Sequence, residues 1–82
     1  MKCTVLHENR GRMRVHMSCG RMSLDEADIL EYYLRSLDEV DEVNVYDRTG
    51  DAIIYYSGNR RNVTDALARF SFGMPGVTEL VP

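Results

Sequence analysis

Residues 12–22 read RMRVHMSCGRM, and this stretch decides how the rest of the chain can fold. Apolar residues alternate with basic ones over its first half, which is the period-two pattern of a strand buried on one face. The apolar set is Met13, Val15 and Met17, and the basic set is Arg12, Arg14 and His16. We therefore expect a strand over 12–17 that carries its basic side chains on the face away from the core.

A helix start follows this strand almost at once. Ser23 and Glu26 have the spacing of a capping box, in which each side chain accepts a hydrogen bond from the other residue's backbone amide. Apolar residues then recur with a period of 3.6, which predicts a helix over 24–37. The residues expected to face the core are Ala27, Leu30, Tyr33, Leu34 and Leu37.

The remaining elements are read from similar patterns. Alternation and β-branched or aromatic residues predict strands, and glycine near the end of residues 47–51 predicts a hairpin loop. Asn62 is a candidate cap for the second helix, whose core side is expected to include Val63, Ala66, Leu67 and Phe70. The expected elements are strands 42–47, 52–56 and 77–81 and a helix over 62–71.

The N-terminal residues 2–8 alternate loosely and form a further candidate strand. The Asn9-Arg10-Gly11 sequence permits either a hairpin with 12–17 or one long strand broken by a bulge, and we favour the second. From residue 12 onward the order is strand, helix, strand, strand, helix, strand. This order predicts an α+β fold, the ferredoxin-like βαββαβ sandwich, with an antiparallel sheet and both helices on one face.

Composition limits the classes of protein to which the chain can belong. Its 82 residues are 44% hydrophobic and 28% charged, which predicts one small folded domain over residues 1–82. The net charge of −3 argues against general affinity for nucleic acid. No apolar run approaches the roughly 18 residues of a membrane span, so no membrane insertion by this segment is expected. Cys3 and Cys19 are expected as reduced thiols in the cytoplasm.

Two motifs resemble a known family. Residues 17–22, MSCGRM, resemble the Met-Thr-Cys-x-x-Cys loop of heavy-metal-associated domains, with Met22 in place of the second cysteine. Residues 7–14, HENRGRMR, are similar to the His-Glu-x-x-Gly-Arg-x-Arg start of a variant branch of these domains, found at the N-terminus of bacterial heavy-metal P-type ATPases. The resemblance implies a cytosolic regulatory or docking domain. It also implies that the chain is an N-terminal fragment of a longer transporter.

The candidate metal ligands are Cys19, Met22 and Met17, soft donors of the kind that Cu(I) accepts, which make a thin site for Cu(I) and an inadequate one for zinc. Met17 falls in the core register, and Met22 can either pack against the helix or act as a ligand. Cys19 is either an inert loop thiol or a thiolate whose pKa is lowered by the helix N-terminus. We expect no required cofactor and at most weak Cu(I) binding.

Arg12, Arg14, His16 and Arg21 form a candidate basic docking face. The partners that the resemblance implies are other domains of the same ATPase, a metallochaperone or a second copy of the chain. Arg12, Arg14 and His16, together with Tyr55, also resemble an RNA-reading surface, and this alternative stays open beside a purely protein-binding one. The 47–51 loop, DRTGD, is similar to the phosphorylated loop of P-type ATPases, but its place between two short strands predicts a hairpin turn and no catalysis.

Overall fold

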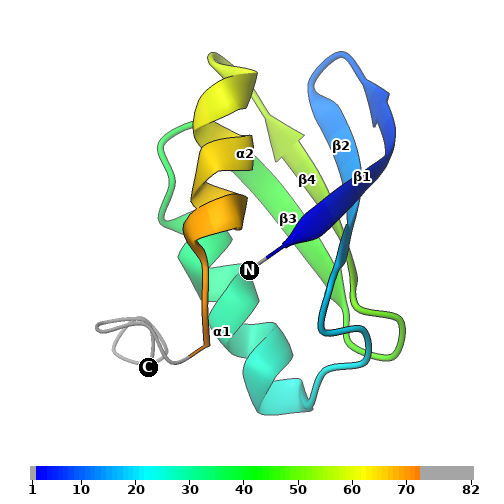
Figure 1. Cartoon of the computed structure of the whole chain (residues 1–82). Coiled ribbons are helices and arrows are strands. Elements are labelled where there is room, and N and C mark those ends of the chain that lie inside the picture. Colours follow the sequence, from blue (N-terminus) through cyan, green and yellow to red (C-terminus); the bar gives the residue numbers. More distant parts are fainter. Residues whose placement is uncertain (1, 73–82) are drawn as a thin grey trace.

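A computed structural model describes residues 2–72 of the chain. Its elements are β1 (Cys3–Asn9), β2 (Arg12–Met17), α1 (Leu24–Arg35), β3 (Val40–Tyr46), β4 (Asp51–Tyr56) and α2 (Arg60–Arg69). The strands form one antiparallel sheet in the order β1-β2-β4-β3, and both helices cover one face of it (Figure 1). The predicted α+β class, with two helices on one face of an antiparallel sheet, is confirmed, and the architecture is compatible with a ferredoxin-like fold.

The element order differs from the predicted βαββαβ, because the described residues begin with two strands. β1 and β2 form a hairpin joined by Arg10 and Gly11, so our preference for one long strand broken by a bulge is wrong. Gly11 has a φ of 77°, a left-handed conformation that favours glycine, and this turn reverses the chain. The predicted final strand over 77–81 lies outside the described residues.

A bulge does occur, but inside β1. The register shifts between Val5 and His7, so the bulge places His7 and Glu8 on the faces opposite to those that simple alternation predicts. Val5 pairs with Val15 on the helix side, and His7 pairs with Arg14 on the other side.

The helix boundaries follow their capping residues. Both hydrogen bonds of the capping box are present at Ser23, as predicted, and α1 ends at Arg35, two residues earlier than expected. The prediction that Asn62 caps α2 is wrong, because Asn59 is the cap and accepts a hydrogen bond from the Arg61 amide at 2.9 Å. Asn62 lies within the first turn, where its side-chain amide donates to Glu39 at 2.9 Å.

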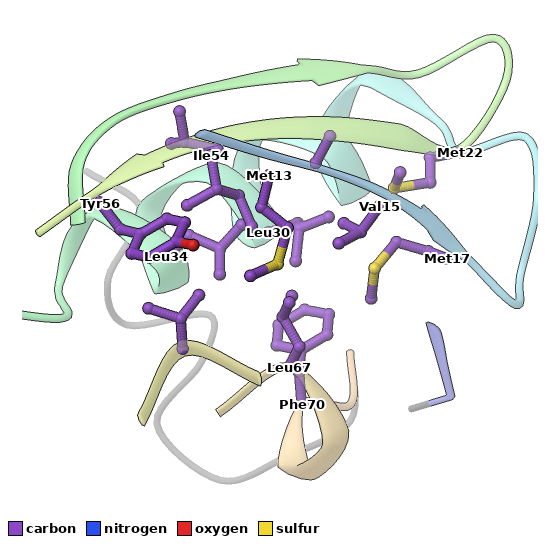
Figure 2. Packing of buried hydrophobic residues seen from close by; sticks show 13 residues of the cluster. Met13, Val15, Met17, Met22, Leu30, Leu34, Ile54, Tyr56, Leu67 and Phe70 are labelled. Carbon is purple, nitrogen blue, oxygen red and sulfur yellow. The ribbon is translucent and has the colours of Figure 1, made fainter. Parts of the chain in front are cut away.

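The core lies between the sheet and the two helices. Met13, Val15 and Met17 of β2 are fully buried there, which confirms the predicted register of this strand (Figure 2). They pack in one cluster with buried residues of the other elements, namely Leu30 and Leu34 of α1, Val43 of β3, Ala52, Ile54 and Tyr56 of β4, Val63 and Leu67 of α2, and Phe70. The face of the sheet that the helices leave uncovered is called the open face below.

Candidate functional site

The loop at residues 17–22, called the sulfur loop below, is fastened to the turn between β3 and β4. The Met17 amide donates to the Gly50 carbonyl at 2.8 Å, and the Met22 amide donates to the Asp47 carbonyl at 2.7 Å. Gly50 also lies against the backbone of Gly20, since a Cβ atom added at Gly50 would stand 2.1 Å from the Gly20 carbonyl oxygen. The path of the sulfur loop is therefore set by backbone contacts with a turn about 30 residues further along the chain.

The three candidate sulfur ligands lie in different environments. Met17 is fully buried and Met22 is 3% exposed, and both belong to the core cluster (Figure 2). Cys19 is on the surface, and its thiol contacts the Gly20 carbonyl at 3.6 Å. The two thioethers are thus packing residues, and only the thiol faces solvent.

The electrostatic environment of Cys19 does not favour its thiolate. Partial burial of the sulfur, reinforced by the Glu26 carboxylate, raises the pKa of Cys19 above its ordinary value of 9.0. This direction is opposite to the one that a thiolate stabilised by the helix N-terminus would show, and it favours the other alternative, an inert loop thiol. A raised pKa reduces the fraction of thiolate at neutral pH, and the thiolate is the form that binds metal.

The sulfur loop supplies too few accessible donors for a bound metal ion. Among residues 2–72, no three His, Cys, Asp or Glu side chains lie together in a group that could hold a metal ion. In this arrangement the sulfur loop offers a single accessible soft donor, Cys19, whereas compact soft-metal sites use at least two. Within residues 2–72, the donors of the sulfur loop therefore do not fit a structural or tightly bound metal ion.

The open face is a grid of twelve side chains, three from each strand. The register places them in three rows that run from β1 through β2 and β4 to β3. These rows are Asn9, Arg12, Tyr55 and Glu42; then His7, Arg14, Ile53 and Asn44; then Thr4, His16, Asp51 and Tyr46. The predicted placement of Arg12, Arg14 and His16 away from the helices is thus confirmed.

Asp51, in the third row, binds two of the basic side chains of β2. Its two carboxylate oxygens accept hydrogen bonds from the Arg14 guanidinium at 2.9 Å and from Nδ1 of His16 at 2.7 Å. The hydrogen bond from His16, helped by Arg14, holds the pKa of Asp51 below its ordinary value of 3.8, although desolvation opposes this shift. Two of the predicted basic residues are therefore bound to the carboxylate of Asp51, a residue that is only 7% exposed.

The sequence reasoning missed Asp51, because it assigned this residue to the hairpin loop. A usable signal was present, since Asp51, Ile53 and Tyr55 alternate with the core residues of the same strand. Arg12 lies 6.0 Å from the centre of the Tyr55 ring, so the predicted basic and aromatic residues do share a face. Arg21 is exposed in the sulfur loop and does not belong to the grid.

A second polar cluster joins the hairpin to α2 on the helix side of the sheet. Oε2 of Glu8 accepts a hydrogen bond from the Tyr56 hydroxyl and another from Nε of Arg60, each at 2.6 Å. The bond from Arg60, followed by that from Tyr56, holds the pKa of Glu8 below its ordinary value of 4.5. This cluster fixes β1 against β4 and the start of α2, and nothing in the sequence pattern pointed to it.

Neither helix within residues 2–72 is long and apolar enough to cross a membrane. Comparisons with protein-family models, with curated proteins and with solved structures find no match for this chain.

Proposed function

We propose that this chain is a cytosolic regulatory or docking domain of a heavy-metal-translocating P-type ATPase, and that it does not itself deliver metal. The element order from β2 to α2 supports the proposal, because it matches the first five elements of the ferredoxin-like fold of heavy-metal-associated domains. In that fold a last strand would lie beside β2, a place that β1 occupies here. The two motifs that resemble this family lie in the β1–β2 hairpin and in the sulfur loop.

The burial of Met17 and Met22 is the observation that carries the proposal. A methionine that ligates Cu(I) has to turn its sulfur toward the ion, and both thioethers here are packed in the core. Moving either one out would leave a cavity that costs about 2–5 kcal/mol, which offsets much of the gain from a neutral soft ligand. The sulfur loop therefore resembles a metal-carrying loop in its sequence, while its methionines pack in the core.

Cys19 remains the one donor available to a soft metal ion on this loop. One exposed thiol with a raised pKa supports weak Cu(I) binding at most. We therefore propose that the domain requires no cofactor. The remaining role is docking on other domains of the transporter, to which ATP hydrolysis and transport would belong. The RNA-binding alternative gains no support from the open face, since Asp51 already binds Arg14 and His16.

A competition titration with a Cu(I) chelator on the reduced protein tests the metal part of the proposal. We expect weaker binding than that of a two-cysteine domain, and a gain of affinity in Met22→Cys. Cys19→Ser should abolish the weak binding, and Cys3→Ser is the matched control. Native affinity equal to that of a two-cysteine domain, lost in Cys19→Ser, would show that metal delivery is the better interpretation.

The docking part is tested with the reading frame that contains this chain. We expect the frame to encode apolar membrane spans and the cytosolic domains of an ATPase after residue 82. Calorimetric titration of those domains, expressed separately, with this protein should then detect binding. A stop codon directly after residue 82, or the absence of binding to any of those domains, would contradict the docking role.

A further inference from the structure

The charges of the open face are separated between its two halves. The half formed by β1 and β2 carries the basic and imidazole side chains, which are His7, Arg12, Arg14 and His16. The half formed by β4 and β3 carries the two carboxylates, Asp51 and Glu42. Arg14 and His16 are already paired with Asp51 within the chain, so the face is dipolar across its strands through the Arg12 guanidinium on β2 and the Glu42 carboxylate on β3.

A dipolar face of this kind is complementary to itself. We propose that two copies of this chain associate through their open faces, related by a twofold axis that runs parallel to the strands between β2 and β4. This rotation places β2 over β4 of the second copy, and β1 over its β3. The half that carries Arg12 then covers the half that carries Glu42, and every contact between the two copies occurs twice, as an isologous interface requires.

The charge pattern also selects this arrangement over the other face-to-face twofold. An axis perpendicular to the strands would stack β2 on β2, which places Arg14 over Arg14 of the second copy and Arg12 over His16. Like charges opposed across an interface are unfavourable, and this rotation also places Arg12 and Glu42 of the second copy at opposite ends of the face, so that arrangement is disfavoured. Packing of two sheets with nearly aligned strands, about 10 Å apart, is one of the ordinary geometries of sheet-on-sheet contact.

The composition of the open face fits such an interface. Tyr46 is 45% exposed at the end of one row, and Tyr55 lies partly exposed in another. Tyrosine is enriched at protein interfaces because it combines a large apolar ring with a polar hydroxyl. Asp51 already has hydrogen-bond donors on both oxygens, so covering it does not leave an unpaired buried charge.

A charge-swap series tests the proposal directly. In the proposed arrangement Arg12 lies one strand away from Glu42 of the second copy, at two equivalent places. At each of these places, Arg12→Glu sets a new carboxylate against the Glu42 carboxylate of the other copy. Glu42→Arg likewise sets a new guanidinium against the Arg12 guanidinium of the other copy. The double variant Arg12→Glu/Glu42→Arg restores opposite charges at both places. Asp28→Arg, on the exposed surface of α1, has the same change in net charge as Glu42→Arg and serves as the control.

Sedimentation velocity over a range of protein concentrations measures the outcome, with circular dichroism to confirm that every variant is folded. We expect the native protein and Asp28→Arg to dimerise with the same Kd, and each single swap to raise that Kd about tenfold or more, which corresponds to about 1.4 kcal/mol. The double variant should regain most of the native affinity, and added salt should weaken the native dimer.

A native protein that stays monomeric at every concentration overturns the proposal, as does a double variant no tighter than the single ones. An equal loss in Asp28→Arg would show that net charge, and not the open face, controls association. This inference goes beyond the proposed function and does not depend on it. The copper titration and the docking measurement report on the sulfur loop and on other domains, so either proposal can fail alone.

Discussion

The sulfur loop and the open face are the two regions in which the sequence predicts binding side chains. The two regions differ in whether the fold buries those side chains or leaves them at the surface. In the sulfur loop, Met17 and Met22 are buried in the core, and backbone hydrogen bonds to Gly50 and Asp47 hold the loop in place. On the open face, polar side chains stay at the surface and are arranged by Asp51. A motif therefore identifies a position in the fold, whereas burial decides whether its side chains remain available for binding.

The largest expected effect concerns the packing role of the sulfur loop. Met17→Ala should lower the free energy of unfolding of the metal-free protein by about 2–5 kcal/mol, because it removes a fully buried side chain and leaves a cavity. Met17→Leu, which nearly conserves volume, should cost less than about 1.5 kcal/mol. Urea unfolding without metal measures both values. A Met17→Ala protein as stable as the native one would show that Met17 is free to act as a ligand.

The attachment of the sulfur loop to the β3–β4 turn gives the next largest effect. Gly50→Ala should cost about 2–4 kcal/mol, since Gly50 has a φ of 79° and its new Cβ would collide with the Gly20 backbone. Gly20→Ala is the matched control, because Gly20 has a φ of 67° but nothing within 4 Å of an added Cβ. Its cost should be about 1–2 kcal/mol. Equal costs for the two variants would contradict the close approach of these backbones.

On the open face, Asp51→Asn should cost about 1 kcal/mol at pH 7, because it weakens two charge-assisted hydrogen bonds. The folded-state pKa of Asp51 lies below its ordinary value of 3.8. The ionised carboxylate therefore makes its full contribution to the free energy of unfolding above pH 3.8. It is lost as the pH falls through the folded-state pKa. The stability difference between native protein and variant, measured by urea unfolding from pH 7 down to pH 2, should therefore shrink in acid. A constant difference would mean that this carboxylate stabilises the fold without its charge.

The smallest effect is expected for Arg12, which lies on the open face over Tyr55. Arg12→Ser should change stability by about 0.5 kcal/mol or less, as is usual for surface substitutions. Arg14→Ser should cost more than Arg12→Ser, because it removes a partner of the buried Asp51 carboxylate. Thermal unfolding of the two variants side by side measures this order. The reverse order would contradict the ion pair between Arg14 and Asp51.

The sequence by itself determined the elements whose signals are local. Alternation over 12–17 predicted both the strand and its buried side, and the spacing of Ser23 and Glu26 predicted where α1 begins. These signals succeed because caps and side-chain periodicity depend on residues only a few positions apart. The same local reasoning failed at Asn62, where Asn59 was an equally suitable cap three residues earlier and only the path of the chain after β4 distinguishes them.

The tertiary structure alone decided which distant residues meet. His16 and Asp51 are 35 positions apart, and Glu8 and Tyr56 are 48 positions apart, so neither pair leaves a local pattern. The strand order placed β1 beside β2, and the register of β2 against β4 brought Asp51 opposite His16. A shift of one residue in the register of β4 against β2 would place the Asp51 side chain in the core and expose Ala52 to solvent. Strand pairing depends on the fit of the whole buried face, and for this reason the sulfur loop could be located from its residues while its function could not.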